Sequence, residues 1–190
     1  MAEFKKTETG IKDLVIIDPA VCIDQRGFFM ETYSKREFEK IGISTEFVQD
    51  NHSRSKKGVL RGLHFQTKHQ QGKLIRVTRG SIWDVAVDLR KGSQTFGRWY
   101  GLVLSEENRK MIYIPKGFAH GFLSLEDNTE IQYKCTDFYY PEYDAGISWD
   151  DPDIDIKWPF EEFELAKEKI VFSLKDRGQP SLKEYLGEIK

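Results

Sequence analysis

The chain has 190 residues, of which 39% are hydrophobic, 13% aromatic and 32% charged, which is the composition of an ordinary soluble globular protein. This length favours a single domain over residues 1–190, with a sizeable hydrophobic core. The formal net charge of -2 argues against a nucleic-acid-binding protein that works through its overall charge, but it permits a local basic pocket for one small anion.

The sequence carries no signal for secretion or for a membrane. The first residues, MAEFKKTETG, contain no apolar core of signal-peptide length, and no later run is long enough to cross a bilayer. The two cysteines, Cys22 and Cys135, lie in strand-like surroundings, so we expect buried thiols rather than a disulfide framework. We therefore expect a cytoplasmic protein with no membrane or nucleic-acid partner.

Short segments in which apolar residues alternate with other residues dominate the chain. In SIWDVAVDL (81–89), Trp83 and every second residue after it share one face, while Ile82, Asp84 and the following even-numbered residues share the other. Similar patterns predict strands over 14–18, 28–33, 73–79, 98–105, 110–115, 120–126 and 129–138. Turn residues separate these segments, as in KKG, QQG, RKGSQ, EEN, PKG and EDN. Many short strands at this spacing indicate an all-β sandwich or barrel.

Helical patterns are few and short. SKREFEKIGI (34–43) predicts one helix, with Ser34 as a cap and Gly42 as its end. EEFELAKEKI (161–170) and PSLKEYLGEI (180–189) predict two more near the C-terminus. The predicted architecture is therefore an all-β domain with a few short peripheral helices.

Four histidines are candidates for chemistry. His69 lies in the polar run TKHQQG and is expected to be a solvated turn residue, while His52 could tie a loop to backbone carbonyls. His64, in the strand-like RGLHFQ, and His120, which begins an apolar strand, could each be a hydrogen-bonded core residue. Two strand histidines in a small β domain raise the prospect of one shared pocket.

A metal site is the first functional hypothesis, and the residues around His64 disfavour it. A catalytic zinc or iron needs about three protein ligands, and the next position on the same strand face as His64 is Gln66, which is a poor ligand. Lys73, the next polar residue at a strand edge, is a cation and would repel a metal. The sequence also contains no glycine-rich phosphate loop before a helix, no nucleophile elbow and no Cys-x-x-Cys pair. The aromatic run TDFYYPEY (136–143) could stack on a planar base or cover the core.

Long ordered blocks of the sequence, together spanning nearly the whole chain, strongly resemble the dTDP-4-dehydrorhamnose 3,5-epimerase family. The blocks are DQRGFFMETY, FVQDNHSRSKKGVLRGLHFQ, QGKLIRVTRGSIWDVAVDLR, FGRWYGLVLS, IPKGFAHGF and YKCTDFYYPEYDAGISWDDP. The resemblance implies a cupin-type β jelly roll (a double-stranded β-helix) and a homodimer, and the fold agrees with the all-β prediction made from alternation.

The resemblance also implies a reaction and a substrate. The substrate is dTDP-4-dehydro-6-deoxy-D-glucose, and the enzyme inverts C3 and C5, the carbons beside the C4 ketone, in dTDP-L-rhamnose biosynthesis. A C–H bond beside a ketone is weakly acidic because its conjugate base is an enolate, yet neutral histidine is a far weaker base than the enolate. Each pKa unit of that mismatch costs about 1.4 kcal/mol, so the site must stabilise the enolate oxygen. The family needs no metal or organic cofactor, because the ketone of the substrate is itself the electron sink.

Four residues match the catalytic positions of the family. The resemblance makes His64 the general base, oriented by Asp176 of SLKD, and places Lys73 opposite the C4 oxygen. Tyr133 of QYKCTDF would deliver a proton from the other face of the sugar. Inversion needs groups on two faces, because a single base would return the same proton to the same side.

Further matching positions imply contacts with the dTDP-sugar. They are Arg26, Glu31, Gln49, Asp50, Asn51, Arg61, His120 and Asp144. Arginines suit the pyrophosphate because a guanidinium pairs with two of its oxygens. Tyr139 matches the residue that stacks on the thymine ring, and its neighbour Tyr140 is an alternative for that role.

The opening half of RGLHFQ poses a geometric problem. In a regular strand Arg61 and His64 point to opposite faces, although both match substrate-binding positions. We expect a local irregularity at Gly62 that turns both side chains toward one site, with Arg61 at the rim as the alternative.

Other readings of the same residues remain open. A related enzyme could epimerise only C3 or only C5, or move the keto group, with the same base and acid. A non-catalytic cupin that binds a sugar nucleotide and a metal-dependent cupin oxygenase or isomerase are the alternatives from other classes.

Overall fold

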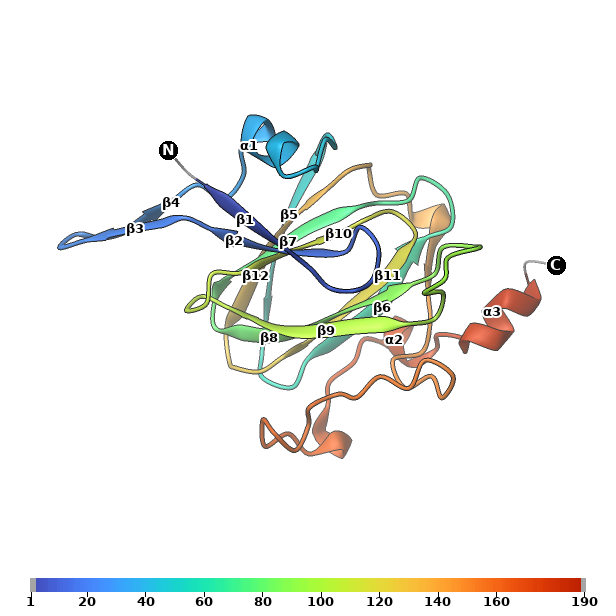
Figure 1. The fold of residues 1–190 in the computed structure, drawn as a ribbon. Coiled ribbons are helices and arrows are strands. Elements are labelled where there is room, and N and C mark those ends of the chain that lie inside the picture. Colours follow the sequence, from blue (N-terminus) through green and yellow to red (C-terminus); the bar gives the residue numbers. More distant parts are fainter. Residues whose placement is uncertain (1–2, 189–190) are drawn as a thin grey trace.

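The computed structural model describes residues 3–188, and its body consists of two antiparallel β-sheets that face each other (Figure 1). The first sheet has six strands in the order β1, β2, β10, β7, β12, β5. They span Phe4–Glu8 (β1), Val15–Pro19 (β2), Met111–Ile114 (β10), Lys73–Arg79 (β7), Thr129–Cys135 (β12) and Gln49–Ser55 (β5). The second has five strands in the order β13, β6, β11, β8, β9. They span Asp144–Gly146 (β13), Leu60–Gln66 (β6), Phe118–Ser124 (β11), Ser81–Asp88 (β8) and Trp99–Ser105 (β9).

The main core fills the space between the two sheets. Ile75 of β7 and Ile131 of β12 come from one sheet and meet Ile82 of β8 from the other, and all three side chains are almost completely buried. Burying an isoleucine side chain stabilises the fold by about 1.5–3 kcal/mol, so this apolar layer holds the sheets together. Strand β8 is buried on both faces. Its outer face carries Val85 and Val87, which pack under the C-terminal segment. The prediction of an all-β, cupin-type fold is confirmed.

The predicted strands agree with the structure more closely than the predicted helices do. Helix α1 (Lys35–Lys40) and helix α3 (Leu182–Glu188) lie where the sequence predicts them, and the remaining predicted residue of the last segment, Ile189, lies outside the described residues. The helix predicted over 161–170 is wrong, since this segment forms turns and one short 3-10 helix, Lys167–Lys169. Three of its apolar side chains instead pack into a separate cluster on the outer face of the second sheet, where they are joined by aromatic residues of the preceding loop. Those three are Phe163, Leu165 and Ile170.

A two-stranded hairpin, β3 (Val21–Asp24) and β4 (Gly27–Met30), projects from the body at the end opposite α3 (Figure 1). The strand predicted over 28–33 therefore ends at Met30. Cys22 lies on this hairpin and is exposed, which corrects the expectation that both thiols are buried, whereas Cys135 is buried. Large apolar side chains on the hairpin are also exposed: Ile23 by 72% and Phe29 by 71%. Such an arm is unusual on a protein that stays monomeric, because exposed apolar patches mark interaction surfaces.

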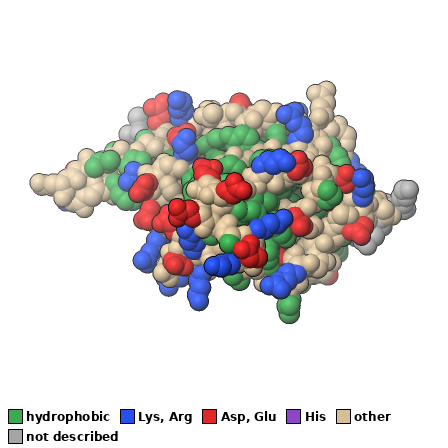
Figure 2. Space-filling model, turned by 90° about the horizontal axis from the view of Figure 1, so that it is seen from below, with side chains coloured by type: hydrophobic (Ala, Val, Ile, Leu, Met, Phe, Trp, Pro, Cys, Tyr) green, Lys and Arg blue, Asp and Glu red, His purple; other side chains and the backbone are tan. Residues whose placement is uncertain are grey.

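The surface carries charges of both signs. On the face shown in Figure 2, acidic and basic side chains lie interspersed around apolar areas. Within residues 3–188, no helix is long and apolar enough to cross a membrane.

Candidate active site

A cavity of about 440 Å³ opens between the two sheets and gathers most of the residues that the sequence singles out. Ten of the predicted site residues line it: Gln49, Asn51, Arg61, His64, Lys73, His120, Tyr133, Tyr139, Asp144 and Asp176. Three predicted residues lie elsewhere. Arg26 and Glu31 are on or just after the projecting hairpin, and Asp50 lines a different pocket, where it pairs with Lys134.

The best-defined contact in the cavity is a histidine–aspartate pair. His64 Nε2 lies 2.6 Å from Asp176 Oδ1, and the side chain of Asp176 is only 3% exposed. Asp176 belongs to the short helix α2 (Leu174–Arg177), and the Ser173 hydroxyl donates a hydrogen bond of 2.5 Å to its other oxygen, Oδ2. Because a carboxylate can only accept, Nε2 of His64 carries the proton of the shared bond and Nδ1 is left with a free lone pair.

Hydrogen bonds set the charge state of Asp176. Burial alone would raise the pKa of this carboxyl, but the hydrogen bonds from His64 and then Ser173 outweigh burial and lower it to about 2. Asp176 is therefore charged at neutral pH. Ser173 was not among the predicted site residues, although the Ser-x-x-Asp spacing of a helix capping box could have revealed it.

The irregularity expected at Gly62 is present. The pairing of β6 with β11 shifts register between His120–His64 and Phe122–Arg61, and both Arg61 and His64 line the cavity as a result. Gly62 has a φ of 123°, and an added Cβ would lie 2.5 Å from the Cα of Gly121. Only glycine fits this position, which explains the glycine in the middle of RGLHFQ.

Tyr133 and Lys73 come from the other sheet, so they face His64 across the cavity. Tyr133 is on β12, and burial raises the pKa of its hydroxyl, which keeps it protonated at neutral pH. Lys73 begins β7, and burial lowers the pKa of its ammonium, while three acidic groups around it act in the opposite direction.

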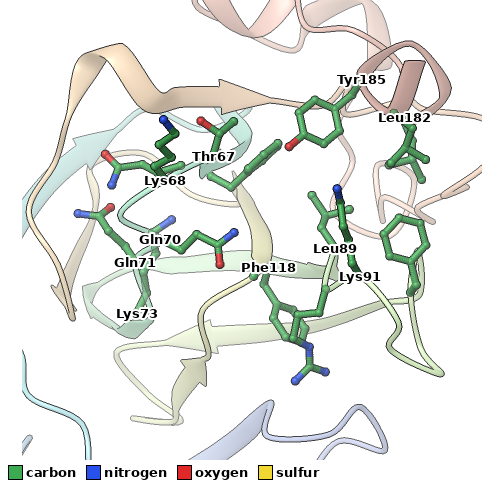
Figure 3. A pocket seen from close by; sticks show the side chains of 16 residues that line it. Thr67, Lys68, Gln70, Gln71, Lys73, Leu89, Lys91, Phe118, Leu182 and Tyr185 are labelled. Carbon is green, nitrogen blue, oxygen red and sulfur yellow. The ribbon is translucent and has the colours of Figure 1, made fainter. Parts of the chain in front are cut away.

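Lys73 also borders a second cavity of about 510 Å³ (Figure 3). This cavity lies between the loop that carries Thr67, Lys68 and Gln70 and helix α3, from which Leu182 and Tyr185 point into it. The two cavities share four lining residues: Phe65, Gln66, Gln71 and Lys73. Lys73 therefore stands at the junction of two solvent-accessible spaces.

A second histidine–aspartate pair includes His120, which lines the same cavity, and a buried aspartate behind it. His120 Nε2 is 2.8 Å from Oδ2 of Asp84, whose side chain is 0% exposed. Asp84 was not among the predicted site residues and was identified only as part of the alternating strand 81–89. The signal that could have singled it out is a carboxylate at an inward position of an apolar strand, since such a group needs a partner.

At the mouth of the cavity, Tyr139 is half-exposed and donates a hydrogen bond of 2.7 Å to Asp144. Asp144 also accepts a hydrogen bond from Lys175 of α2, so three segments meet there. Tyr140 instead packs on His69, with the ring centroids 4.4 Å apart, and it does not line the cavity. The side chain of His69 is exposed, as predicted for a turn residue, but its ring also packs on Tyr140.

The remaining candidate, His52, lies on the outer face of β5, where it contacts the carboxylate of Glu130 at 2.9 Å and not the backbone of a loop. In the part of the chain that the structure describes, no group of three or more His, Cys, Asp or Glu side chains is arranged to hold a metal ion.

The chain matches a family of known proteins over almost its whole length. The family model for dTDP-4-dehydrorhamnose 3,5-epimerase matches residues 8–184. The dTDP-4-dehydrorhamnose 3,5-epimerase of Methanothermobacter thermautotrophicus is 54% identical over 184 residues, which cover 97% of each chain.

Solved structures agree with the sequence match. A dTDP-6-deoxy-D-glucose-3,5-epimerase of Legionella pneumophila, in complex with dTDP-4-keto-L-rhamnose, is 45% identical with a TM-score of 0.92 and covers 98% of this chain and 97% of its own. A 3'-monoepimerase of Streptomyces bikiniensis, in complex with dTDP-quinovose, is 31% identical with a TM-score of 0.84 and covers 94% of this chain and 89% of its own. The chain therefore belongs to the dTDP-4-dehydrorhamnose 3,5-epimerase family.

Proposed function

We propose that this protein is an isomerase that inverts C3 and C5 of dTDP-4-dehydro-6-deoxy-D-glucose in dTDP-L-rhamnose biosynthesis. A relative named for this reaction is 54% identical over 97% of the chain, and a solved relative holds dTDP-4-keto-L-rhamnose. The observation that carries the proposal is that His64, bonded to Asp176, and Tyr133 line one cavity from two different sheets.

In the proposed mechanism, Nδ1 of His64 removes the proton from the carbon beside the ketone. Nε2 keeps its proton and its hydrogen bond to Asp176, whose negative charge stabilises the imidazolium that forms. The electron pair of the broken C–H bond moves into the C4 carbonyl and gives an enolate. No cofactor is needed for this step, because the ketone accepts the electrons.

The enolate then takes a proton on its other face. Tyr133 is the donor we propose, since it faces His64 across the cavity and its raised pKa keeps it protonated until the enolate forms. The Lys73 ammonium and His120 are the groups we assign to the C4 oxygen, where negative charge develops. Once His64 has released its proton to solvent and Tyr133 has regained one, the same steps at the second carbon complete the double epimerisation.

The nucleotide end of the substrate would lie toward the mouth of the cavity. Tyr139 is half-exposed there and lines the cavity, which favours it over Tyr140 for stacking on the thymine ring. Arg61 is the cation we assign to the pyrophosphate, with Gln49 and Asn51 of β5 as hydrogen-bonding neighbours.

Two of the three predicted binding residues outside the cavity, Arg26 and Glu31, support a homodimer. Arg26 is 85% exposed at the tip of the projecting hairpin, and within this subunit its partner is Asp24. We propose that the hairpin packs its exposed Ile23 and Phe29 on a second copy and delivers Arg26 and Glu31 to the site of that copy. This arrangement covers the apolar arm and completes the substrate contacts.

We treat residues 1–190 as one epimerase domain, because the C-terminal segment packs on the second sheet and supplies Asp176. We place the protein in the cytoplasm, where the unpaired thiols of Cys22 and Cys135 stay reduced.

The test is incubation with dTDP-4-dehydro-6-deoxy-D-glucose in deuterated water, followed by NMR. We expect deuterium at both C3 and C5 with the wild type and at neither carbon with His64→Asn. Label at C3 alone would overturn the double epimerisation and favour a 3'-monoepimerase like the Streptomyces bikiniensis relative. No label at either carbon with the wild type would leave a non-catalytic binding protein.

A further inference from the structure

Gln66, the last residue of RGLHFQ, is a buried polar residue for which the proposed reaction has no assigned use. It is only 3% exposed, and it borders both cavities. Its amide carries two N–H donors and a carbonyl acceptor, and burying such a group is unfavourable unless each finds a partner. The partners of this amide therefore indicate what the residue does.

The amide of Gln66 binds only backbone groups, and these lie in two loops. Nε2 donates to the carbonyl oxygens of His69, at 2.6 Å, and Phe138, at 3.1 Å. Oε1 accepts from the backbone N–H of Tyr140 at 2.6 Å. Because a carbonyl only accepts and an N–H only donates, these partners fix the orientation of the amide. Gln66 thus ties the end of β6 to the loops 67–72 and 136–140.

These bonds determine which of two neighbouring tyrosines faces the cavity. Two of them hold Phe138 and Tyr140, the residues on either side of Tyr139. The same amide holds the backbone of His69, and the rings of His69 and Tyr140 pack on each other with their centroids 4.4 Å apart. Tyr140 is therefore occupied away from the cavity, and Tyr139 is the tyrosine of this pair that lines it.

Tyr139 is itself held at both ends. Its backbone N–H donates to Oε1 of Gln49 at 3.0 Å, and its hydroxyl donates to Asp144 at 2.7 Å. The residue is nevertheless 50% exposed, so part of its surface stays available to a ligand. A ring that is already fixed loses little freedom when a ligand stacks on it, which favours binding.

We propose that Gln66 is a positioning residue that presents Tyr139, rather than Tyr140, to the base of the nucleotide. This inference rests on the proposed function, in which Tyr139 stacks on the thymine ring. Gln66 acts through the backbone on either side of Tyr139 and not through a contact with the base. The sequence leaves Tyr139 and Tyr140 as alternatives, and the bonds of Gln66 supply the physical reason for the choice.

The test is the binding of dTDP, measured by calorimetry, to the wild type and to Gln66→Met. Methionine has a similar length but lacks the amide, so the N–H of Tyr140 and the carbonyl of Phe138 lose their partner. We expect the Kd for dTDP to rise about tenfold, which is the scale of losing one base–aromatic stack. An unchanged Kd overturns the proposal.

Gln71→Met is the matched control. Gln71 also borders both cavities, and its amide donates to the carbonyl of Asp137 in the same loop, at 2.8 Å (Figure 3). That bond does not flank Tyr139, so the Kd for dTDP should rise less than about threefold. An equal loss in the two variants would mean that any loosening of the loop weakens binding, and it would overturn the specific role of Gln66.

A double-mutant cycle separates positioning from a general loss of structure. Tyr139→Ala should also weaken dTDP binding about tenfold, and adding Gln66→Met to it should cost less than about twofold more, because no ring is left to position. A further tenfold loss, or an unaffected Tyr139→Ala, overturns the proposal. With the sugar nucleotide as substrate, Gln66→Met should raise KM more than it lowers kcat, and the reverse would contradict a role at the nucleotide end.

Hydrogen exchange of the wild type covers the case in which Gln66→Met does not fold. The amides of Tyr139 and Tyr140 each donate to a glutamine side chain, so without dTDP they should exchange at least about 100-fold more slowly than in an unstructured peptide. Exchange at the peptide rate that slows only when dTDP is added would mean that the nucleotide orders the loop, and it would overturn the proposal. A wild type that binds no dTDP rejects the proposed function together with this inference, whereas equal binding by the wild type and Gln66→Met rejects this inference alone.

Discussion

Replacing Asp176 by asparagine is the sharpest test of the proposed base. The amide has the same shape as the carboxylate, and its oxygen can still accept from Nε2 of His64, so the substitution removes mainly the negative charge. That charge stabilises the imidazolium formed when His64 takes a proton. We therefore expect slower C–H cleavage at both carbons with little change in KM.

The structure sets the size of the effect. The fold lowers the pKa of Asp176 from 3.8 to about 2, because hydrogen bonds from His64 and Ser173 outweigh the opposing effect of burial. At about 1.4 kcal/mol per pKa unit, the folded environment as a whole, burial included, stabilises the carboxylate by about 2.5 kcal/mol. His64 supplies the largest favourable part of this, and coupling between two groups is reciprocal. We expect kcat to fall by between about 10-fold and about 60-fold, the upper value being the whole of that energy.

The assay is the initial rate of deuterium entry at C3 and C5 under saturating substrate. Asp151→Asn is the matched control, because Asp151 is as deeply buried as Asp176 but caps the backbone of Ile154 and Leu182 away from the cavity. It should lower the melting temperature and leave kcat within about twofold of the wild type. If Asp176→Asn also exchanges within twofold of the wild type, the charge of Asp176 does not support the base and the assigned pair is wrong.

Three further predictions follow from the site and the hairpin. Tyr133→Phe should slow inversion more than first exchange of the C–H bond, because deprotonation needs only the base; equal losses in NMR time courses would remove Tyr133 as the acid. The free energy of unfolding should fall as the pH drops from about 4 to about 2. Asp176 has a folded pKa of about 2, below its ordinary value, so the stability it contributes is present above pH 3.8 and is lost as the pH falls through the folded pKa. Urea unfolding should therefore show a smaller loss of stability in acid for Asp176→Asn than for the wild type. Phe29→Asp should give monomers in sedimentation and lower kcat/KM, whereas the exposed control Lys157→Ala should leave the sedimentation unchanged; a wild-type monomer would contradict the dimer.

Alternation was sufficient to predict strands that line the apolar core, and it failed where the strands are polar. The segment 73–79 was predicted with the bounds of β7, because apolar side chains recur along it and glycines flank it. Strand β5, QDNHSRS, contains no apolar residue, so hydrophobic periodicity cannot detect it. Its inward side chains face the cavity and its outward ones face solvent, which gives each face a polar composition.

The candidate site required more than periodicity. A histidine in a strand, taken alone, is as well explained by a hydrogen-bonded core residue. The catalytic role of His64 was predicted only from the long sequence blocks shared with a family. The contact of His64 with Asp176 joins residues 112 positions apart, which no local pattern can reveal. The inward turn of Arg61 could be expected only by noticing that regular alternation at Gly62 would send Arg61 away from His64.

The interior between the sheets is polar at one end and apolar at the other, and this division explains how the site can hold charge. Along β12, Tyr133 faces the cavity and Ile131 joins the core; along β8, Asp84 is followed toward the core by Ile82. The apolar end stabilises the fold, and this stabilisation offsets the cost of burying ionisable groups at the polar end. Regular strands also fix these groups more firmly than loops would, and a developing enolate gains most from partners that are already oriented and shielded from water.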